Sequence, residues 1–197
     1  MTDDRFARAI AAIDAANAQG PEVVMVRGRE GPKEVLHAEL ATEWVRRLRP
    51  GAGEALLLAA RGHHLRRWAV PRASYPAGRA GYLRWRRELH GRHARELGAL
   101  LEGAGYDPAT IARVQAIVRK EGLGSDPEVQ TFEDALCLVF VETQLADVAA
   151  RLEPATLRRV LAKTTAKMSA AGRAALAELP LPADVRALLD AAARPAG

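Results

Sequence analysis

The residues most able to do chemistry gather in one stretch, RGHHLRRWAVPRASYPAGRAGYLRWRRELHGRH, at residues 61–93. Four of the five histidines of the chain lie there, among arginines, tryptophans and tyrosines. Imidazoles are common metal ligands, and guanidinium groups bind phosphate or carboxylate through paired hydrogen bonds. The stretch therefore predicts a metal site, an anion pocket or a nucleic-acid surface, and the simplest alternative is the solvated face of a helix.

The charge of this segment separates it from the rest of the chain. Residues 61–95 contain ten arginines, no lysine and one acid, Glu88, so they carry +9 and, with a whole-chain charge of +5, leave −4 for the remainder. Arginine outnumbers lysine throughout, 25 to 4, which a codon bias explains. Such a bias does not explain the near absence of acids, which favours an anionic partner at one place.

Two successive predicted helices, residues 32–48 and 53–67, bring histidines together. If they form an antiparallel hairpin, His37 and His63 each lie thirteen residues from the proline of the turn and sit at the same height, as in metal sites of helical proteins. His63 and His64 diverge by roughly 100° on a regular helix, so both reach one ion only if the helix end distorts. The alternative is that these histidines bind no metal and only interact favourably with the negative end of the helix dipole at the C-terminus.

The predicted central helix, residues 131–152, supplies the carboxylates. It is apolar on most of its circumference, so a charged side chain there is costly to bury unless it is paired or metal-bound. Glu142, which follows CLVFV, is the preferred ligand, with a buried ion pair to an arginine as the alternative. Second-tier candidates are His90 and His93, whose i, i+3 spacing can chelate, and Asp134 and Asp147.

The arginines and aromatic residues form a candidate anion-binding group. The irregular loop AVPRASYPAG leads into the longest predicted helix, residues 78–103. Arg79, Tyr82 and Arg86 fall at i, i+3 and i+7 and share one face of that helix. The alternative is that the aromatic rings pack into the core and most arginines are solvated. The candidate anion-binding residues are Arg67, Arg72, Tyr75, Arg79, Tyr82, Arg86 and Lys120.

Apolar spacing is helical nearly everywhere. It predicts an all-α, single-domain helical bundle over residues 1–197, with about eight or nine helices and at most one short strand or hairpin near residues 22–27. The last residues, ARPAG, are expected to fray. The other predicted helices cover residues 3–18, 107–122, 154–167, 170–177 and 183–193.

Other features of the sequence exclude several classes of protein. No run of about eighteen apolar residues occurs, and the N-terminus lacks the apolar core of a signal peptide, so we expect a cytoplasmic protein without a membrane partner. The single cysteine, Cys137, excludes an internal disulfide and fits a reducing compartment. Glycine-rich phosphate loops, dinucleotide fingerprints, serine elbows and zinc-finger spacings are absent.

The order of these features resembles the HD superfamily of helical metal-dependent phosphohydrolases. KEVLHAELATEWVRRL resembles its first histidine element, ALLLAARGHHLRRW its His-Asp doublet, and FEDALCLVFVETQLADV the helix of its last carboxylate. The resemblance implies an HD-like core over residues 32–152, followed by C-terminal helices at 154–193. It implies metal ligands at His37, His63 and either Glu142 or Asp147. His64 stands where that superfamily has aspartate, a departure from its binuclear site.

A closer resemblance is to an uncharacterised family catalogued as domain of unknown function 4202, over most of the chain from Phe6 to Leu152. Two long strings carry it, GHHLRRWAVPRASYPAGRAGYLRWR and RKEGLGSDPEVQTFEDALCLVFVE. This resemblance implies membership of the family and supplies no activity.

Residues and resemblance together predict a metal-dependent, phosphohydrolase-like enzyme acting on a small phosphorylated or otherwise anionic substrate. The expected cofactor is a divalent ion such as Zn, Mn, Fe or Ni, held by His37, His63, His64 and Glu142. The HD resemblance also implies that diiron oxygen chemistry is possible on this scaffold. Two alternatives stay open: a non-catalytic RNA- or nucleotide-binding module using residues 61–95, and an interaction scaffold with a degenerate site.

Overall fold

A computed structural model describes residues 2–193 of the chain. Within that range the protein is a single helical domain with one small β-hairpin, which confirms the predicted fold class. The α-helices are α1 (Thr2–Asn17), α2 (Lys33–Leu48), α3 (Glu54–Gly62), α4 (Gly78–Gly103), α5 (Pro108–Arg119), α6 (Pro127–Thr143), α7 (Leu145–Arg151), α8 (Pro154–Lys167), α9 (Ala170–Glu178) and α10 (Ala183–Ala193).

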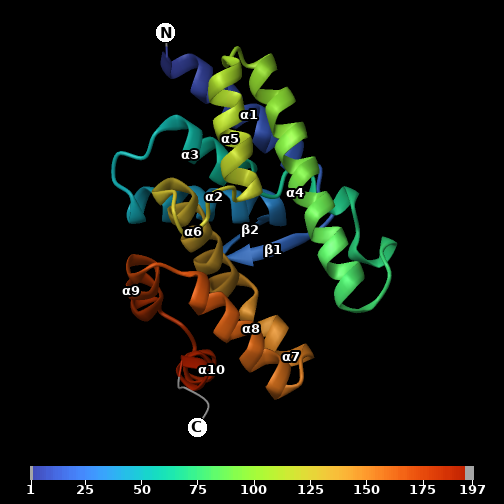
Figure 1. Cartoon of the computed structure of the whole chain (residues 1–197), viewed down its shortest axis with the longest axis vertical. Coiled ribbons are helices and arrows are strands. Elements are labelled where there is room, and N and C mark those ends of the chain that lie inside the picture. The colour runs from blue at the N-terminus through green and yellow to red at the C-terminus, as the bar shows by residue number, and fades with distance from the viewer. Residues whose placement is uncertain (1, 194–197) are drawn as a thin grey trace.

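Two groups of helices make up the domain (Figure 1). In one group α5 lies along α4 and packs on α3, while α1 contacts α3 and α4. In the other, α8 and α9 pack on α6, and α10 packs on α8. The helix α2 joins the groups because it packs against both α3 and α6. None of the helices between residues 2 and 193 is long and apolar enough to span a bilayer.

The core centres on α6, as its sequence predicts. Phe132, Leu138 and the following Leu145 are fully buried, and α6 contacts α2, α3, α5, α7, α8 and α9. A helix that is apolar on most sides must be covered on most sides, because its exposed apolar surface would cost free energy. Cys137 is buried on this helix, and burial raises the pKa of its thiol to about 12.

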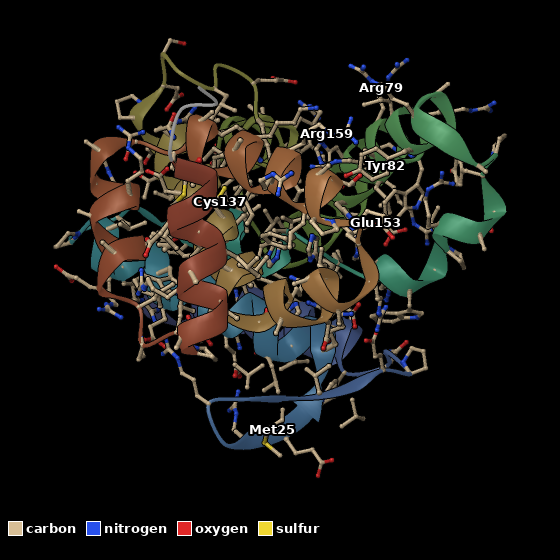
Figure 2. All side chains as sticks on the ribbon, turned by 90° about the horizontal axis from the view of Figure 1, so that it is seen from below. Met25, Arg79, Tyr82, Cys137, Glu153 and Arg159 are labelled. Carbon is tan, nitrogen blue, oxygen red and sulfur yellow. The ribbon has the colours of Figure 1, made fainter. Side chains whose placement is uncertain are left out.

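A two-stranded antiparallel hairpin covers one edge of the domain. The strands β1 (Val23–Val26) and β2 (Arg29–Pro32) are joined by Arg27 and Gly28. Both turn residues have positive φ, 48° and 77°, which is the conformation that a two-residue hairpin favours. Arg27 then reaches back to the helices, whereas Met25 projects outward at the edge of the molecule (Figure 2).

Helix boundaries follow the sequence prediction with three differences. The predicted helix 53–67 ends at Gly62, because the following residues form a turn in which Arg66 adopts a left-handed conformation with φ of 49°. The predicted helix 131–152 begins earlier, at Pro127, and is two helices, broken at the non-helical Gln144. The predicted helix 107–122 stops at Arg119. The expected fraying falls on residues 194–197, outside the described residues.

Candidate functional site

Four histidines from three helical regions lie together inside the domain. His37 on α2, His63 at the end of α3 and His93 on α4 are 3%, 4% and 1% exposed. The rings of His63 and His64 lie 4.0 Å apart between centroids, and those of His64 and His93 lie 6.1 Å apart. His37 is close enough to His63 to lower its pKa, as the predicted packing of α2 on α3 requires. We call His37, His63, His64 and His93 the histidine cluster.

A glycine at the end of α3 allows this part of the chain to approach α4 closely. A Cβ atom on Gly62 would come within 2.5 Å of Cδ2 of Leu97, so only glycine lets α3 approach α4 this closely. The chain then leaves the helix, and His63 and His64 lie in a turn instead of on successive helical positions. In this turn the two imidazole rings lie side by side, with their centroids 4.0 Å apart.

Two members of the histidine cluster are fixed in orientation by the main chain. His63 Nδ1 lies 2.8 Å from the carbonyl oxygen of Ala60, and His93 Nδ1 lies 2.8 Å from that of Leu65. A carbonyl oxygen only accepts, so each Nδ1 carries the proton and each Nε2 keeps a lone pair. Both Nε2 atoms are buried and have no hydrogen-bond partner among the described residues.

Burial keeps the histidine cluster neutral. It lowers the pKa of His63 to about 3 and the pKa values of His37 and His93 to about 4. The pKa of His64 also falls well below its usual value, first through burial and then through His63. Protonating one ring disfavours the next, since like charges repel in a poorly hydrated interior. Neutral imidazole is the form that binds metals.

The histidine nitrogens do not converge on one point. Among residues 2–193, no three His, Cys, Asp or Glu side chains are arranged to hold a metal ion as they stand. The hollow of about 470 Å³ beside the hairpin is lined by Arg27, Trp44 and Glu142, not by the histidine cluster.

A buried carboxylate with two lysines lies next to the histidines. Glu133 on α6, whose side chain is 2% exposed, accepts hydrogen bonds from Lys120 and from Lys167, the latter at 2.6 Å. Burial alone would raise the pKa of Glu133, but the two ammonium groups lower it below its usual value. Burial also lowers the pKa of Lys120, whereas at Lys167 the attraction of Glu133 exceeds the effect of burial and raises the pKa.

Lys120 adopts an unusual backbone conformation for a residue with a side chain. It has φ of 61° and ends α5, with Lys120 N and Glu121 N donating to the carbonyl oxygens of Ile117 and Ala116. Glycine normally occupies this position, because a Cβ atom in the left-handed region costs roughly 1 kcal/mol. Backbone strain of this kind is tolerated where the side chain has a role in the fold or function. Here the side chain of Lys120 forms an ion pair with Glu133.

Two arginines complete the positive surroundings of the histidines. Arg67, half-buried, stacks on Trp85 with 4.8 Å between its guanidinium carbon and the ring centroid. Arg86 on α4 donates to the Tyr82 hydroxyl at 3.2 Å and lies 3.5 Å from His90 Nε2. Neither arginine has a carboxylate within 4 Å in the described part of the chain. Burial, and then Arg86, lower the pKa of Arg67.

Glu142 does not join the histidine cluster. It accepts hydrogen bonds from Arg27 at 2.5 Å and from Trp44 Nε1 at 3.1 Å, on the hairpin side of α6. An ion pair with an arginine was the alternative that the sequence left open, but this pair is only partly buried, with Arg27 41% and Glu142 15% exposed. Glu133, nine residues earlier, is the carboxylate of α6 that lies near the histidines, since His90 senses its charge.

The predicted anion-binding residues divide into two sets. Arg67, Arg86 and Lys120 lie beside the histidines, as described above. Arg72 instead donates to the carbonyl oxygens of Tyr75 and Pro76 and so holds its own loop. The hydroxyl of Tyr75 donates to Glu88 at 2.5 Å. Arg79 points into solvent at the edge of the molecule, and Tyr82 is 41% exposed (Figure 2).

The second-tier residues also divide. His93 belongs to the histidine cluster, and His90 lies one turn away beside Arg86, with its pKa lowered by burial to about 4. Asp134 is buried but structural, because it accepts hydrogen bonds from the Ser169 amide and hydroxyl. Asp147 is exposed on α7.

Sequence reasoning missed three charged residues of the site. Glu133 neighbours Asp134 on the same apolar helix, so the argument about buried charge applied to it equally. Glu34, one turn before His37, has a buried Oε2 with no hydrogen-bond partner in the described range, and burial raises its pKa. The role of Lys167 could not be predicted from the sequence, because Lys167 lies far along the chain from α6, which it contacts only in the folded protein.

Comparison with known proteins places the chain in a family. Residues 7–189 match the family described as Domain of unknown function (DUF4202). The chain belongs to this family. No curated protein and no solved structure matches it. The DUF4202 match covers the histidine cluster and the Glu133 pair, and it extends through the C-terminal helices to α10, beyond the stretch that the sequence motifs carried.

Proposed function

We propose that this DUF4202 protein is a metal-dependent enzyme that acts on a small phosphorylated substrate, with the metal held by the histidine cluster. The main support for this proposal is that the Nε2 atoms of His63 and His93 are buried and have no hydrogen-bond partner among the described residues. A buried acceptor without a partner costs roughly 1–3 kcal/mol, and a bound metal ion would remove that cost.

The donor set fits a borderline divalent ion. Metal-binding histidines commonly donate the other ring nitrogen to a carbonyl or carboxylate, which fixes the tautomer and aims the lone pair. His63 and His93 both show this pattern with main-chain carbonyls. Imidazole ligands suit Zn, Fe, Ni and Mn to different degrees. His37 and His64 are the further candidate ligands, and Glu34, whose buried Oε2 has no hydrogen-bond partner among the described residues, is a candidate carboxylate.

The side chains around the histidine cluster suit an anionic substrate. Arg67 and Arg86 are free of carboxylates and can each donate two hydrogen bonds to a phosphate group. A divalent ion in such a site polarises a phosphoryl oxygen or lowers the pKa of bound water. The arginines would orient the substrate and offset its charge, and the apolar surroundings would limit competing water.

The first experiment measures metal in protein purified without added metal and without histidine tags. We expect near-stoichiometric Zn, Fe, Mn or Ni by elemental analysis. Substituting His63→Ala or His93→Ala should lower the metal content at least tenfold, because each removes a donor whose tautomer is already fixed.

Glu142→Gln is the matched control. It should leave metal content unchanged, since Glu142 binds Arg27 and Trp44. The proposal fails if the protein holds no metal after reconstitution, or if the His63 and His93 variants retain it. Loss of metal in Glu142→Gln would restore the original ligand assignment. Hydrolysis of phosphate monoesters with and without the metal then tests the reaction.

A second candidate function, binding of RNA or a nucleotide, is favoured by one surface. The first half of α4 exposes Arg79, Arg84 and Arg87 around Tyr82, the combination that binds phosphates and stacks bases. Binding by this surface would weaken steeply with salt and would persist without metal.

A further inference from the structure

Two lysines bind the buried carboxylate of Glu133, and Arg86 brings a further positive charge near both lysines and near Arg67. Arg67, Arg86, Lys120 and Lys167 come from the turn after α3, from α4, from the end of α5 and from the end of α8. Glu133 is bonded to both lysines and is the acid placed among them. Counting these five side chains alone, the group carries a net charge of +3.

These cations lie close enough to disturb one another. Arg86 acts on the charged forms of Arg67, Lys120 and Lys167, in each case disfavouring the proton. Arg67 also senses Glu34, but that carboxylate stays beyond ion-pair distance. Glu133 can neutralise only one of the two ammonium groups, and neither arginine has a carboxylate within 4 Å among the described residues. Positive charge is therefore in excess here, which is costly for stability and typical of an anion-binding site.

The four cations can be reached from solvent, and their positive charge exceeds the single negative charge of Glu133. The side chain of Lys167 is 43% exposed, that of Lys120 is 16% exposed, and Arg67 and Arg86 are half-buried. Arg86 lies near Arg67 and near both lysines, and all four side chains are at least partly exposed, so a ligand at Arg86 can reach its positive neighbours from solvent. The C-terminal helices take part, because Lys167 is the last residue of α8.

We propose that Arg67, Arg86, Lys120 and Lys167 form a phosphate-binding site, and that the substrate carries a terminal phosphate monoester dianion. This inference deepens the proposed function by naming the charged group of the substrate. A dianion offsets most of a +3 charge, whereas a carboxylate monoanion leaves most of it uncompensated. Arginines contribute paired hydrogen bonds to such oxygens, and lysines act as point charges.

The test uses metal-free protein and inorganic phosphate as the probe. Thermal unfolding is followed at pH 7.5 with 10 mM phosphate, acetate or chloride at equal ionic strength. We expect phosphate to raise Tm by about 3–8 °C, given a dissociation constant on the order of 0.1–1 mM, and acetate to have no more effect than chloride.

Variants assign the effect to the four cations. Arg67→Gln and Lys167→Gln should each remove most of the shift caused by phosphate. Lys167 is exposed, so its variant should fold even if the Arg67 variant does not. The matched controls are Arg79→Gln and Arg159→Gln, which remove exposed arginines of α4 and α8 and should retain the full shift.

Each contrary result has a definite meaning. An equal shift with acetate, or a shift that survives both Arg67→Gln and Lys167→Gln, overturns the phosphate-binding site. A shift lost in Arg79→Gln instead would assign the anion to the exposed face of α4 and favour nucleic acid. The result of the phosphate test is independent of the metal test, because the protein can bind phosphate without metal and can bind metal without binding phosphate.

Discussion

Glu133 decides the electrostatics of the site at the residue scale. It is nearly inaccessible to water, and it holds two ammonium groups that would otherwise face each other. We expect Glu133→Gln to lower the free energy of unfolding by about 2–4 kcal/mol, because breaking a buried ion pair leaves the partner charges uncompensated. The charge of Lys167 contributes less to this loss, since its side chain reaches solvent. Urea unfolding at pH 7 measures this loss.

A second substitution separates charge from packing at the same position. Adding Lys120→Met to Glu133→Gln should recover at least half of the lost stability, because one uncompensated ammonium group is removed. Glu121→Gln, which affects an exposed pair with Arg119, should change stability by less than about 0.5 kcal/mol. Equal losses in the Glu121 and Glu133 variants would mean that the buried pair has no special importance.

The contact between α3 and α4 controls the histidines at the scale of elements. Gly62→Ala should destabilise the protein by about 1–3 kcal/mol, because the new Cβ would meet Leu97, which is fully buried and cannot move aside. It should also lower metal affinity, since it displaces the turn that carries His63 and His64. Thermal unfolding and metal content are measured on the same preparation.

Gly103→Ala, at the end of α4, is the control for this effect. No atom lies within 4 Å of the Cβ position there, so alanine should be neutral or stabilising by roughly 0.5–1 kcal/mol. If Gly62→Ala were as harmless as Gly103→Ala, close packing of α3 on α4 would not be what positions the histidines.

The buried histidines make the whole molecule sensitive to acid. Their pKa values, about 3 to 4 when folded, lie below the usual 6.5, so the unfolded chain takes up protons first as the pH falls. The stability they contribute is complete above pH 6.5 and is lost as the pH falls from there toward 4. We expect metal-free protein to lose at least about 1 kcal/mol between pH 7 and pH 5.

Unfolding by urea at pH 7.5, 6.5, 5.5 and 4.5 measures this loss. His37→Gln should flatten the dependence, because it removes one of the groups that titrates differently in the two states. The ion pair of Asp126 does not imitate the effect, since Arg113 holds the pKa of Asp126 at about 2, below this range. A free energy of unfolding that stays constant down to pH 5 would contradict the burial of the histidines.

Local signals in the sequence were sufficient for most helices. The prediction for α4, residues 78–103, matches its bounds, because a loop rich in proline and glycine precedes it and a glycine follows the last apolar position. The start of α5 was also predicted, and Asp107, the first residue of the predicted range, accepts a hydrogen bond from the Thr110 amide at 2.9 Å as the cap of this helix. Such features depend on neighbours along the chain, which the sequence displays directly.

The pairing of His37 with His63 could be predicted for the same reason, because a short turn between helices fixes their relative height. The end of the helix at Gly62 could not be predicted, since Leu65 and Arg66 give no sign of it in the sequence. The close approach of Gly62 to Leu97 could not be predicted either, because Leu97 lies thirty-five residues further on.

The sequence by itself determined that this protein is helical and that α6 is its core, and it indicated the histidines and arginines of one segment as candidates for a functional site. Only the tertiary structure decided which carboxylate faces them. An α-helix that is apolar on nearly every side carries no periodic signal for its orientation, so Glu133 and Glu142 were equivalent in sequence. The packing of α6 on α2 and α5 directs Glu142 to Arg27 and Glu133 to Lys120 and Lys167.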